Sequence, residues 1–271
     1  MNNQFGNHRT LYLAFALSVF GIATHAADAP PAASDENADP KATEQWEPVP
    51  AIVTPGTTDS AAPSDAIVLF DGRNLDQWVM TNDHAPAHWK VHDGVVTVDK
   101  TTGNIETKQS FRNYQLHLEW QIPKGITGEG QLRGNSGLFV ASTGSGDDGY
   151  EVQILDSYEN KTYVNGQAAS VYKQAPPLAN AMRAPGGWQT YDVIWTAPVF
   201  KSDGSVAKPA YVTVLHNGVL VQNHFELGGE TTFRGKPKYK PYHEAPIKLQ
   251  AHGDPSPPIS FRNIWIRKLA D

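Results

Sequence analysis

The sequence predicts an all-β fold, a jelly-roll β-sandwich made of two antiparallel sheets. From Ile67 onward, short runs alternate apolar and polar residues, as in Leu116-His117-Leu118-Glu119-Trp120, and a period of two is typical of strands with one buried face. Gly, Asn, Asp and Pro separate these runs, as they do between the short strands of sandwiches. No amphipathic helix of useful length interrupts the series.

The predicted strands follow one another with short connections. Asn217-Gly218 lies between two of them, and this pair favours a type I′ turn because both central residues of that turn need positive φ. We therefore predict a hairpin at this point, and we find no internal repeat of fixed period. The runs that we interpret as strands are 88–98, 114–122, 136–141, 150–155, 189–196, 210–215, 219–224, 247–252 and 259–268.

The N-terminus has the pattern of a signal peptide over residues 1–26. Arg9 is the only charged side chain before an apolar run at 11–23, and Thr24-His25-Ala26 ends in a small residue suited to cleavage. The run is short for a bilayer span and no stop-transfer segment follows, so we expect export to the periplasm or the medium, without membrane insertion after cleavage. An uncleaved anchor is the alternative. The chain has no Cys, which excludes a lipid-anchored Cys and a disulfide scaffold.

Residues 27–64 are predicted to form an acidic leader or linker rich in Ala and Pro. Seven acidic residues stand there against Lys41 alone, and such a segment cannot bury enough apolar surface to offset the entropy of ordering it. The predicted folded domain is then 65–271. The formal net charge of the whole chain is -6, which favours neither nucleic acid nor an anionic membrane as a partner.

A polar stripe on the strand 150–156 is the first candidate site. Glu151 and Gln153 lie two residues apart and therefore share one face of a regular strand, whereas Val152 and Ile154 face the core. Asp156 rejoins that polar face only if a bulge intervenes. Carboxylates and an amide on a concave sheet can grip sugar hydroxyls, although an ordinary solvent-facing strand shows the same alternation.

Two further clusters carry polar side chains beside strands. Arg133 and Asn135 precede an apolar run and can hold carbonyl or hydroxyl oxygens, although Asn135 can also simply close a turn. Gln250 and His252 share a strand face ahead of a Gly/Pro loop, and a neutral His at a strand end is a candidate general base. A structural imidazole is the alternative there. Arg262 either pairs with a carboxylate in the cleft or caps the sheet edge.

Lys108 and Tyr158 complete the set of candidates. Lys108 lies at a strand end, where it is either a site cation or a surface residue, and Tyr158 can stack on a sugar ring. His84, His88 and His92 do not have the spacing of a metal site in a strand-and-loop context, so no metal ligand is assigned. Phosphate-loop, dinucleotide-binding and nucleophile-elbow motifs do not occur.

Several of these motifs, taken in order, resemble the 3-keto-disaccharide hydrolase domain family, long known as a domain of unknown function. The resemblance covers roughly residues 65–269. The segment Leu69-Phe70-Asp71-Gly72-Arg73-Asn74-Leu75-Asp76-Gln77-Trp78 is similar to the start of that domain. The other matching segments are Trp89-Lys90-Val91-His92-Asp93-Gly94-Val95, Asn135-Ser136-Gly137-Leu138-Phe139, Tyr150-Glu151-Val152-Gln153-Ile154-Leu155-Asp156, His216-Asn217-Gly218, Gln250-Ala251-His252-Gly253 and Phe261-Arg262-Asn263-Ile264.

The resemblance implies a concanavalin A-like fold that cleaves 3-keto-glycosides by elimination and hydration. In that chemistry a ketone at C3 acidifies the C2 proton, which a base removes while the C1 oxygen leaves. We expect His252 as the base and Glu151 as the acid. Arg133 with Asn135, or Lys108, would hold the C3 oxygen, and the remaining candidates would bind hydroxyls. These are Gln153, Asp156, Gln250, Tyr158 and Arg262.

The resemblance also implies a sugar 3-dehydrogenase as a functional partner, because that class of enzyme makes the keto substrate. No cofactor is assigned, although a divalent cation such as calcium could replace the enolate donors. The strand 150–156 is also similar to the Glu-x-Asp-x-x-Glu strand of laminarinase-type hydrolases. Gln153 stands in place of the middle acid, which disfavours a two-carboxylate mechanism. A non-catalytic carbohydrate-binding module and a conventional endo-glucanase are the alternatives.

Overall fold

The computed structural model describes residues 39–270, so the predicted signal peptide and the start of the acidic leader lie outside the described residues. The chain divides into two units, Met1–Ala51 and Ile52–Asp271. In the first unit, the described part contains one 3₁₀ turn, η1 (Pro40–Thr43), which Asp39 caps by accepting from the Lys41 backbone N–H. Among residues 39–270, no helix has the length and apolarity needed to cross a membrane.

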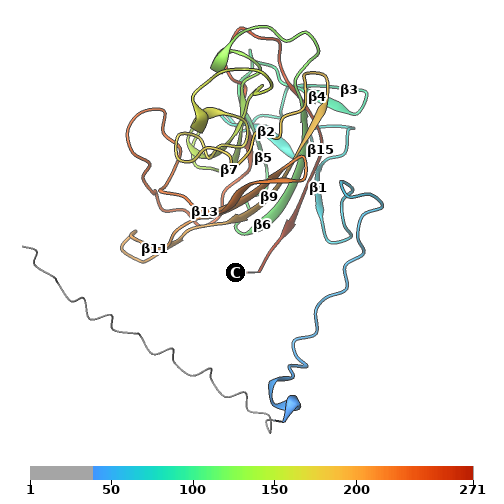
Figure 1. Cartoon of the computed structure of the whole chain (residues 1–271), viewed down its shortest axis with the longest axis vertical. Coiled ribbons are helices and arrows are strands. Elements are labelled where there is room, and N and C mark those ends of the chain that lie inside the picture. Colours follow the sequence, from blue (N-terminus) through green and yellow to red (C-terminus); the bar gives the residue numbers. More distant parts are fainter. Residues whose placement is uncertain (1–38, 271) are drawn as a thin grey trace, which may run out of the picture. The chain divides into compact units, whose positions relative to one another are not determined.

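The second unit contains a large antiparallel sheet of eight strands. The order is β13-β12-β9-β6-β15-β4-β3, and β1 pairs with β15 beside β4. Figure 1 shows β9, β6 and β15 running side by side through this sheet. Its strands are β1 (Ile67–Phe70), β3 (Lys90–His92), β4 (Val95–Thr97), β6 (Tyr114–Gln121), β9 (Trp188–Thr196), β12 (Tyr211–His216), β13 (Val219–Glu226) and β15 (Ser260–Lys268).

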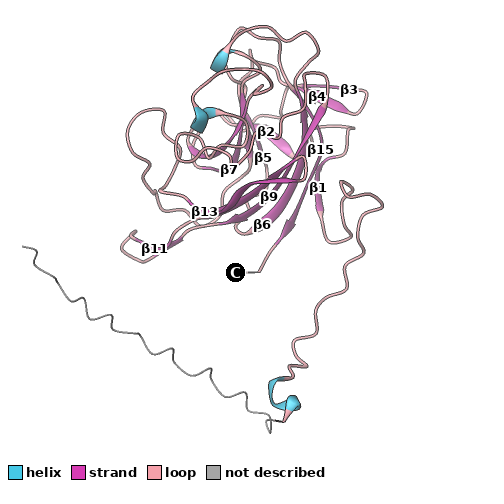
Figure 2. Ribbon diagram, in the orientation of Figure 1, coloured by secondary structure: helices cyan, strands magenta, loops and turns pink. Residues whose placement is uncertain are grey.

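A smaller antiparallel sheet of five strands has the order β2-β5-β14-β7-β8. Its strands are β2 (Trp78–Met80), β5 (Ile105–Thr107), β14 (Lys248–Leu249), β7 (Ser136–Ser142) and β8 (Gly149–Ile154). A separate hairpin pairs β10 (Val199–Phe200) with β11 (Val206–Lys208). Figure 2 shows that the helical segments in this unit are short and lie in connections; they are η2 (Gly130–Leu132) and η3 (Val164–Gly166).

The core lies between the two sheets because each strand turns alternate side chains inward. In β6, Leu116, Leu118 and Trp120 are completely buried, and in β8 the inward residues are Val152 and Ile154. The small sheet therefore has one face on the core and one outer face, and the polar residues of β8 lie on the outer face. The predicted jelly-roll sandwich of two antiparallel sheets is confirmed.

Two local differences from the prediction matter for the site. The predicted strand 88–98 is a hairpin, because Asp93 and Gly94 turn with positive φ values of 49° and 77°. The predicted strand 247–252 ends at Leu249. Beyond it, the Ala251 backbone N–H donates to the Asn104 side chain instead of a neighbouring strand. The predicted hairpin at Asn217-Gly218 is confirmed, with φ values of 52° and 79°.

Candidate functional site

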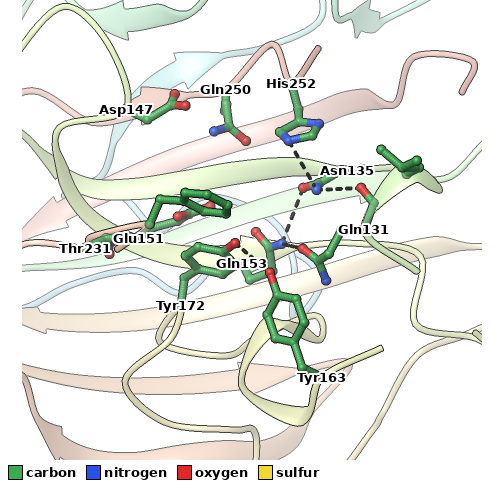
Figure 3. Close-up of a pocket in the computed structure, with 12 residues that line it drawn as sticks. Gln131, Asn135, Asp147, Glu151, Gln153, Tyr163, Tyr172, Thr231, Gln250 and His252 are labelled. Atoms are coloured by element: carbon green, nitrogen blue, oxygen red, sulfur yellow. Dashed lines mark hydrogen bonds between the residues drawn. The ribbon is translucent and has the colours of Figure 1, made fainter. Parts of the chain in front are cut away.

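A cavity of about 460 Å³ opens on the outer face of the small sheet. Strand β8 supplies Glu151 and Gln153 to its floor, and the segment after β14 supplies Gln250 and His252. Figure 3 shows these side chains directed toward the same space. The residues that line the cavity are Gln131, Leu132, Asn135, Asp147, Glu151, Gln153, Tyr163, Tyr172, Thr231, Phe233, Gln250 and His252.

Glu151 is a buried carboxyl group, with 5% of the residue exposed. Burial raises the pKa of Glu151 to about 8; the nearby charge of Asp147 adds to the rise, and that of Lys248 opposes it. The residue is therefore mainly protonated at neutral pH and can donate a proton. Gly137 packs directly against it, since a Cβ at that glycine would lie 2.6 Å from Glu151 Oε1. Any larger residue at 137 would displace the carboxyl group.

His252 is held by a buried carboxylate. Its Nδ1 lies 3.1 Å from Asp254 Oδ2, and the Asp254 side chain is fully buried. Lys100 Nζ donates to the same oxygen at 2.9 Å. Burial alone would raise the pKa of Asp254, but hydrogen bonds from His252, Ser256 and Lys100 outweigh it and lower the pKa to about 2. Two groups of Asp254 face Nδ1: the ionised carboxylate, which can only accept, and the backbone N–H at 3.2 Å, which can only donate. The charged carboxylate is the stronger partner, so we assign the proton to Nδ1.

The second imidazole nitrogen is consequently free to act as a base. His252 Nε2 lies 3.4 Å from Asn135 Nδ2, which is a donor group, and about a third of the imidazole is exposed toward solvent. A nitrogen that faces a donor keeps its lone pair. The arrangement of Asp254, His252 and Asn135 thus presents an unprotonated Nε2 at the cavity wall.

Three amide side chains form a connected network beside the histidine. Asn135 Nδ2 donates to the Gln131 carbonyl at 2.8 Å, and one terminal atom of the Gln153 amide lies 3.1 Å from Gln131 Oε1 and 3.3 Å from Asn135 Oδ1. The other terminal atom lies 2.9 Å from Glu151 Oε1 and 3.0 Å from the Ser136 carbonyl oxygen. Two acceptors favour the amide nitrogen at that position, where it donates to both oxygens and holds the Glu151 carboxyl group.

Gln250 differs from these amides because its side-chain oxygen has no hydrogen-bond partner. Its Oε1 is shielded from solvent and unpaired within residues 39–270, and 5% of the residue is exposed. A buried acceptor without a partner costs free energy unless a ligand supplies the donor. Because Gln250 lines the cavity next to His252, this oxygen is suited to accept from a substrate hydroxyl (Figure 3).

Aromatic side chains also line the cavity. Tyr163 and Tyr172 join through their hydroxyls, 2.6 Å apart, and Phe233 stands on the loop after Thr231. Lys173 Nζ lies 4.0 Å from the centre of the Phe233 ring and donates to the Phe233 carbonyl at 2.8 Å. Phe233 is 66% exposed, so its face is available to pack against a sugar ring or an apolar leaving group.

Five of the residues predicted from the sequence meet in this cavity, namely Glu151, His252, Asn135, Gln153 and Gln250. Arg133 and Asp156 do not line it. Arg133 Nε donates to Asp156 Oδ2 at 2.7 Å, the Asp156 side chain is fully buried, and the Arg133 guanidinium also donates to the Tyr158 carbonyl. Arg133 and Tyr158 line a separate, more open hollow. Arg133, Asp156 and Tyr158 thus lie outside the cavity that holds the other candidates.

Lys108 and Arg262 also lie away from this cavity. Lys108 lines a second cavity, which is separate from the first. Arg262 donates to Glu119 Oε2 at 2.7 Å and lies 4.0 Å from the centre of the Trp188 ring, both on the large sheet. The pairing of Arg262 with a carboxylate was one of its two predicted roles, but the partner does not line the cavity. Strand pairing sets these directions, and the sequence does not reveal which strands pair.

The donor set for a divalent ion is not assembled here. Within the described part of the chain, no group of three or more His, Asp or Glu side chains is placed to hold a metal. Glu151 is mainly protonated at neutral pH, and Asp254 is occupied by Lys100 and His252. The residues therefore do not fit the calcium ion considered from the sequence, and no step below uses one.

Sequence reasoning missed several residues of the site. Asp254 lies only two positions after His252, and a carboxylate so close to a candidate base was a usable signal. Lys100 comes from a distant segment, and nothing in its local sequence marks it. Gln131 lies only two residues before Arg133, beside a cluster that the sequence did indicate.

Comparison with known proteins identifies the family of the chain. Residues 65–267 match the model of the 3-keto-alpha-glucoside-1,2-lyase-like domain family, which covers most of the chain. The chain belongs to this family. The match contains every side chain that lines the cavity and nearly the whole of the predicted domain 65–271.

Two relatives of this chain are informative. A 3-keto-disaccharide hydrolase from Bacteroides thetaiotaomicron is 26% identical over 248 residues, which cover 75% of this chain and 78% of that protein. A crystal structure from Parabacteroides distasonis, of a protein provisionally named a glycosyl hydrolase, is 53% identical and superposes with a TM-score of 0.80. The superposition covers 87% of this chain and 99% of the chain of that protein. The chain is thus a glycoside-acting enzyme.

A third structure supports the fold alone. Another Parabacteroides distasonis protein with the same provisional name is 22% identical and superposes with a TM-score of 0.56, over 76% of this chain and 94% of its own. The sandwich is therefore retained where most of the sequence has changed.

Proposed function

We propose that the protein cleaves 3-keto-glycosides by elimination across C1 and C2, followed by hydration. One observation carries the proposal: a mainly protonated Glu151 and a His252 held by Asp254 line the same cavity. An elimination needs a base for the C2 proton and an acid for the leaving oxygen, and these two side chains supply that pair. The family and the named hydrolase relative support the 3-keto substrate.

His252 Nε2 takes the proton from C2, which the neighbouring C3 ketone acidifies. The electron pair of the C2–H bond forms the C1–C2 double bond, and the C1–O bond breaks. Glu151 gives its proton to the departing oxygen, which leaves as an alcohol. Water then adds its oxygen to C1 and a proton returns to C2, so the net reaction is hydrolysis. Asp254 stabilises the imidazolium that forms in the first step.

The amides bind and orient the sugar. Gln250 Oε1 accepts from a ring hydroxyl, which gives that buried oxygen the partner it lacks in the free protein. Asn135 and the Gln250 amide N–H lie beside His252 and are the available donors for the C3 oxygen as negative charge develops there. These donors replace Arg133 and Lys108, which lie elsewhere.

Two variants test these roles on a 3-keto-glucoside. His252→Ala and Glu151→Gln should each lower kcat by about 10²- to 10⁴-fold, the usual contribution of a positioned acid or base. Arg133→Lys serves as the control outside the cavity and should turn over substrate at nearly the wild-type rate. Turnover by both cavity variants near the wild-type rate would exclude the assignment.

Direct displacement at C1 is the second candidate, because Asp147 also lines the cavity. Asp147 and Glu151 would then be the two carboxyl groups of a conventional glycosidase. Asp147 is exposed, and its Oδ1 accepts from Asn104 Nδ2 at 3.1 Å. Release of sugar from unoxidised glucans, abolished in Asp147→Asn, would favour this reading over elimination.

The proposal includes the cellular location of the enzyme and a partner that supplies its substrate. The sequence pattern of residues 1–26 supports export, and a keto substrate requires an oxidising partner of the sugar 3-dehydrogenase class. Mass spectrometry of the protein from a periplasmic fraction tests cleavage after Ala26. Full-length protein confined to the cytoplasm would contradict export.

A further inference from the structure

A second cavity, of about 680 Å³, opens on the same outer face of the small sheet. The loop 143–148 separates it from the first, since Asp147 lines one cavity and Thr143 and Ser145 line the other. The fully buried Lys248 holds this loop in place. Its Nζ donates to the carbonyls of Gly144, Gly146 and Asp148 at 2.8, 2.8 and 2.9 Å. All three N–H donors of Lys248 are satisfied by loop carbonyls, so this side chain fixes the loop that forms the wall between the cavities.

A buried carboxylate forms part of the floor of the second cavity. Glu106 is 6% exposed, and its Oε2 accepts from Ser142 Oγ at 2.7 Å. Its Oε1 has a looser contact, 3.5 Å from His84 Nδ1. Glu106 on β5 pairs with Lys248 on β14, and Lys248 pairs with Phe139 on β7. Phe139 in turn pairs with Glu151 on β8, so Glu106 and Glu151 lie in the same row across the sheet. The outer face therefore presents one carboxyl group to each cavity.

Two of the residues that line this cavity carry hydroxyls that are buried without a partner. Thr143 Oγ1 and Tyr242 Oη are shielded from solvent and have no hydrogen-bond partner within residues 39–270. Each could donate or accept if a ligand entered. The Lys and Glu side chains that line the cavity balance in sign, with Lys108 and Lys240 against Glu106 and Glu244.

We propose that this second cavity binds a neutral carbohydrate unit, apart from the catalytic cavity. Sugar hydroxyls both donate and accept, so they match a carboxylate flanked by free hydroxyls and an aromatic ring. The lining has no net excess of either charge, since Lys108 and Lys240 offset Glu106 and Glu244, and an apolar ligand would leave the buried polar atoms unpaired. The proposal rests on the glycoside-acting class of the enzyme and does not depend on elimination as the mechanism.

The two cavities are too far apart for one sugar ring. Glu106 and Glu151 are separated by three strand spacings, about 14 Å at the usual interval between neighbouring strands. The second cavity is thus an accessory site for an unoxidised sugar, whose occupancy would keep a glycan near the catalytic cavity.

Saturation-transfer NMR on the full chain tests the proposal with maltotriose, cellotriose and methyl β-D-glucoside as probes. At least one probe should bind the wild-type protein. Glu106→Ala and the double variant His84→Asn with Lys108→Ala should weaken binding at least about tenfold. The double variant changes two exposed residues, and Asn tolerates the positive φ of 56° at position 84, so it tests the site even if Glu106→Ala does not fold.

Gln250→Ala is the matched control in the catalytic cavity and should bind the three probes like the wild type. Turnover of a 3-keto-glucoside should be unchanged in the double variant. The proposal is overturned if no neutral probe binds, if Gln250→Ala abolishes binding, or if the double variant loses turnover. It is also overturned if glucuronate or inorganic phosphate competes more strongly than every neutral sugar.

Discussion

Replacing Glu151 by Gln should stabilise the protein in a way that depends on pH. The pKa of Glu151 lies at about 8 in the folded protein against an ordinary value of 4.5, so the folded state holds a proton that the unfolded chain releases between these values. Stability then falls with rising pH by about 1.36 kcal/mol per unit across this window. Relative to acid pH, the loss of unfolding free energy is about 3 kcal/mol at pH 7 and levels off above pH 8. Gln mimics the protonated carboxyl and does not ionise, so the variant does not lose this stability.

Urea unfolding of both proteins at pH 4, 7 and 9 measures the effect. The difference in unfolding free energy should grow from pH 4 to pH 9, whatever constant offset the amide adds. Thr231→Ser is the control, because it changes the same cavity without a titrating group and keeps the hydroxyl that accepts from the Glu151 backbone. A difference between Glu151→Gln and wild type that stays constant over this range would mean that Glu151 is ionised in the fold. The assignment of Glu151 as the general acid would then be wrong.

The other predictions concern activity and the residues outside the cavity. Asp254→Asn should lower kcat about 10²- to 10⁴-fold with little change in KM, because His252 loses the anionic acceptor that fixes its tautomer and stabilises the imidazolium; an unchanged kcat in steady-state assays would contradict this. The rate should fall above about pH 8 as Glu151 loses its proton, and a pH–rate profile flat to pH 10 would refute that role. Arg133→Ala should cost about 3–5 kcal/mol of stability in urea unfolding, because it leaves a buried carboxylate unpaired, while KM stays unchanged. A large rise in KM with normal stability would mean that Arg133 contacts the substrate.

The fold could be predicted because strand alternation records which face is buried. Glu151 and Gln153 were expected on one face with Val152 and Ile154 on the other, and the structure places them so. Strand lengths were harder to predict. The run 247–252 looks uniform in sequence, yet the chain leaves the sheet after Leu249 and brings His252 over the cavity.

The site could be predicted only in part, because side-chain direction beyond a strand end is a tertiary property. Arg133 and Asn135 are two residues apart, yet Arg133 turns toward Asp156 while Asn135 faces His252. Pairing across a long sequence separation decides both directions. The charge of Lys100 reaches Asp254 across 154 positions, so no local pattern could have revealed it.

The most direct test of elimination is the fate of hydrogen at C2. A 3-keto-glucoside is turned over in heavy water, and the reducing sugar is trapped at early times and examined by NMR, with authentic product incubated alone to correct for spontaneous exchange. Elimination and hydration predict one solvent deuterium at C2 for each bond cleaved, together with a slower rate for substrate deuterated at C2. A product that retains its original C2 hydrogen, formed at a rate insensitive to that label, would contradict the account.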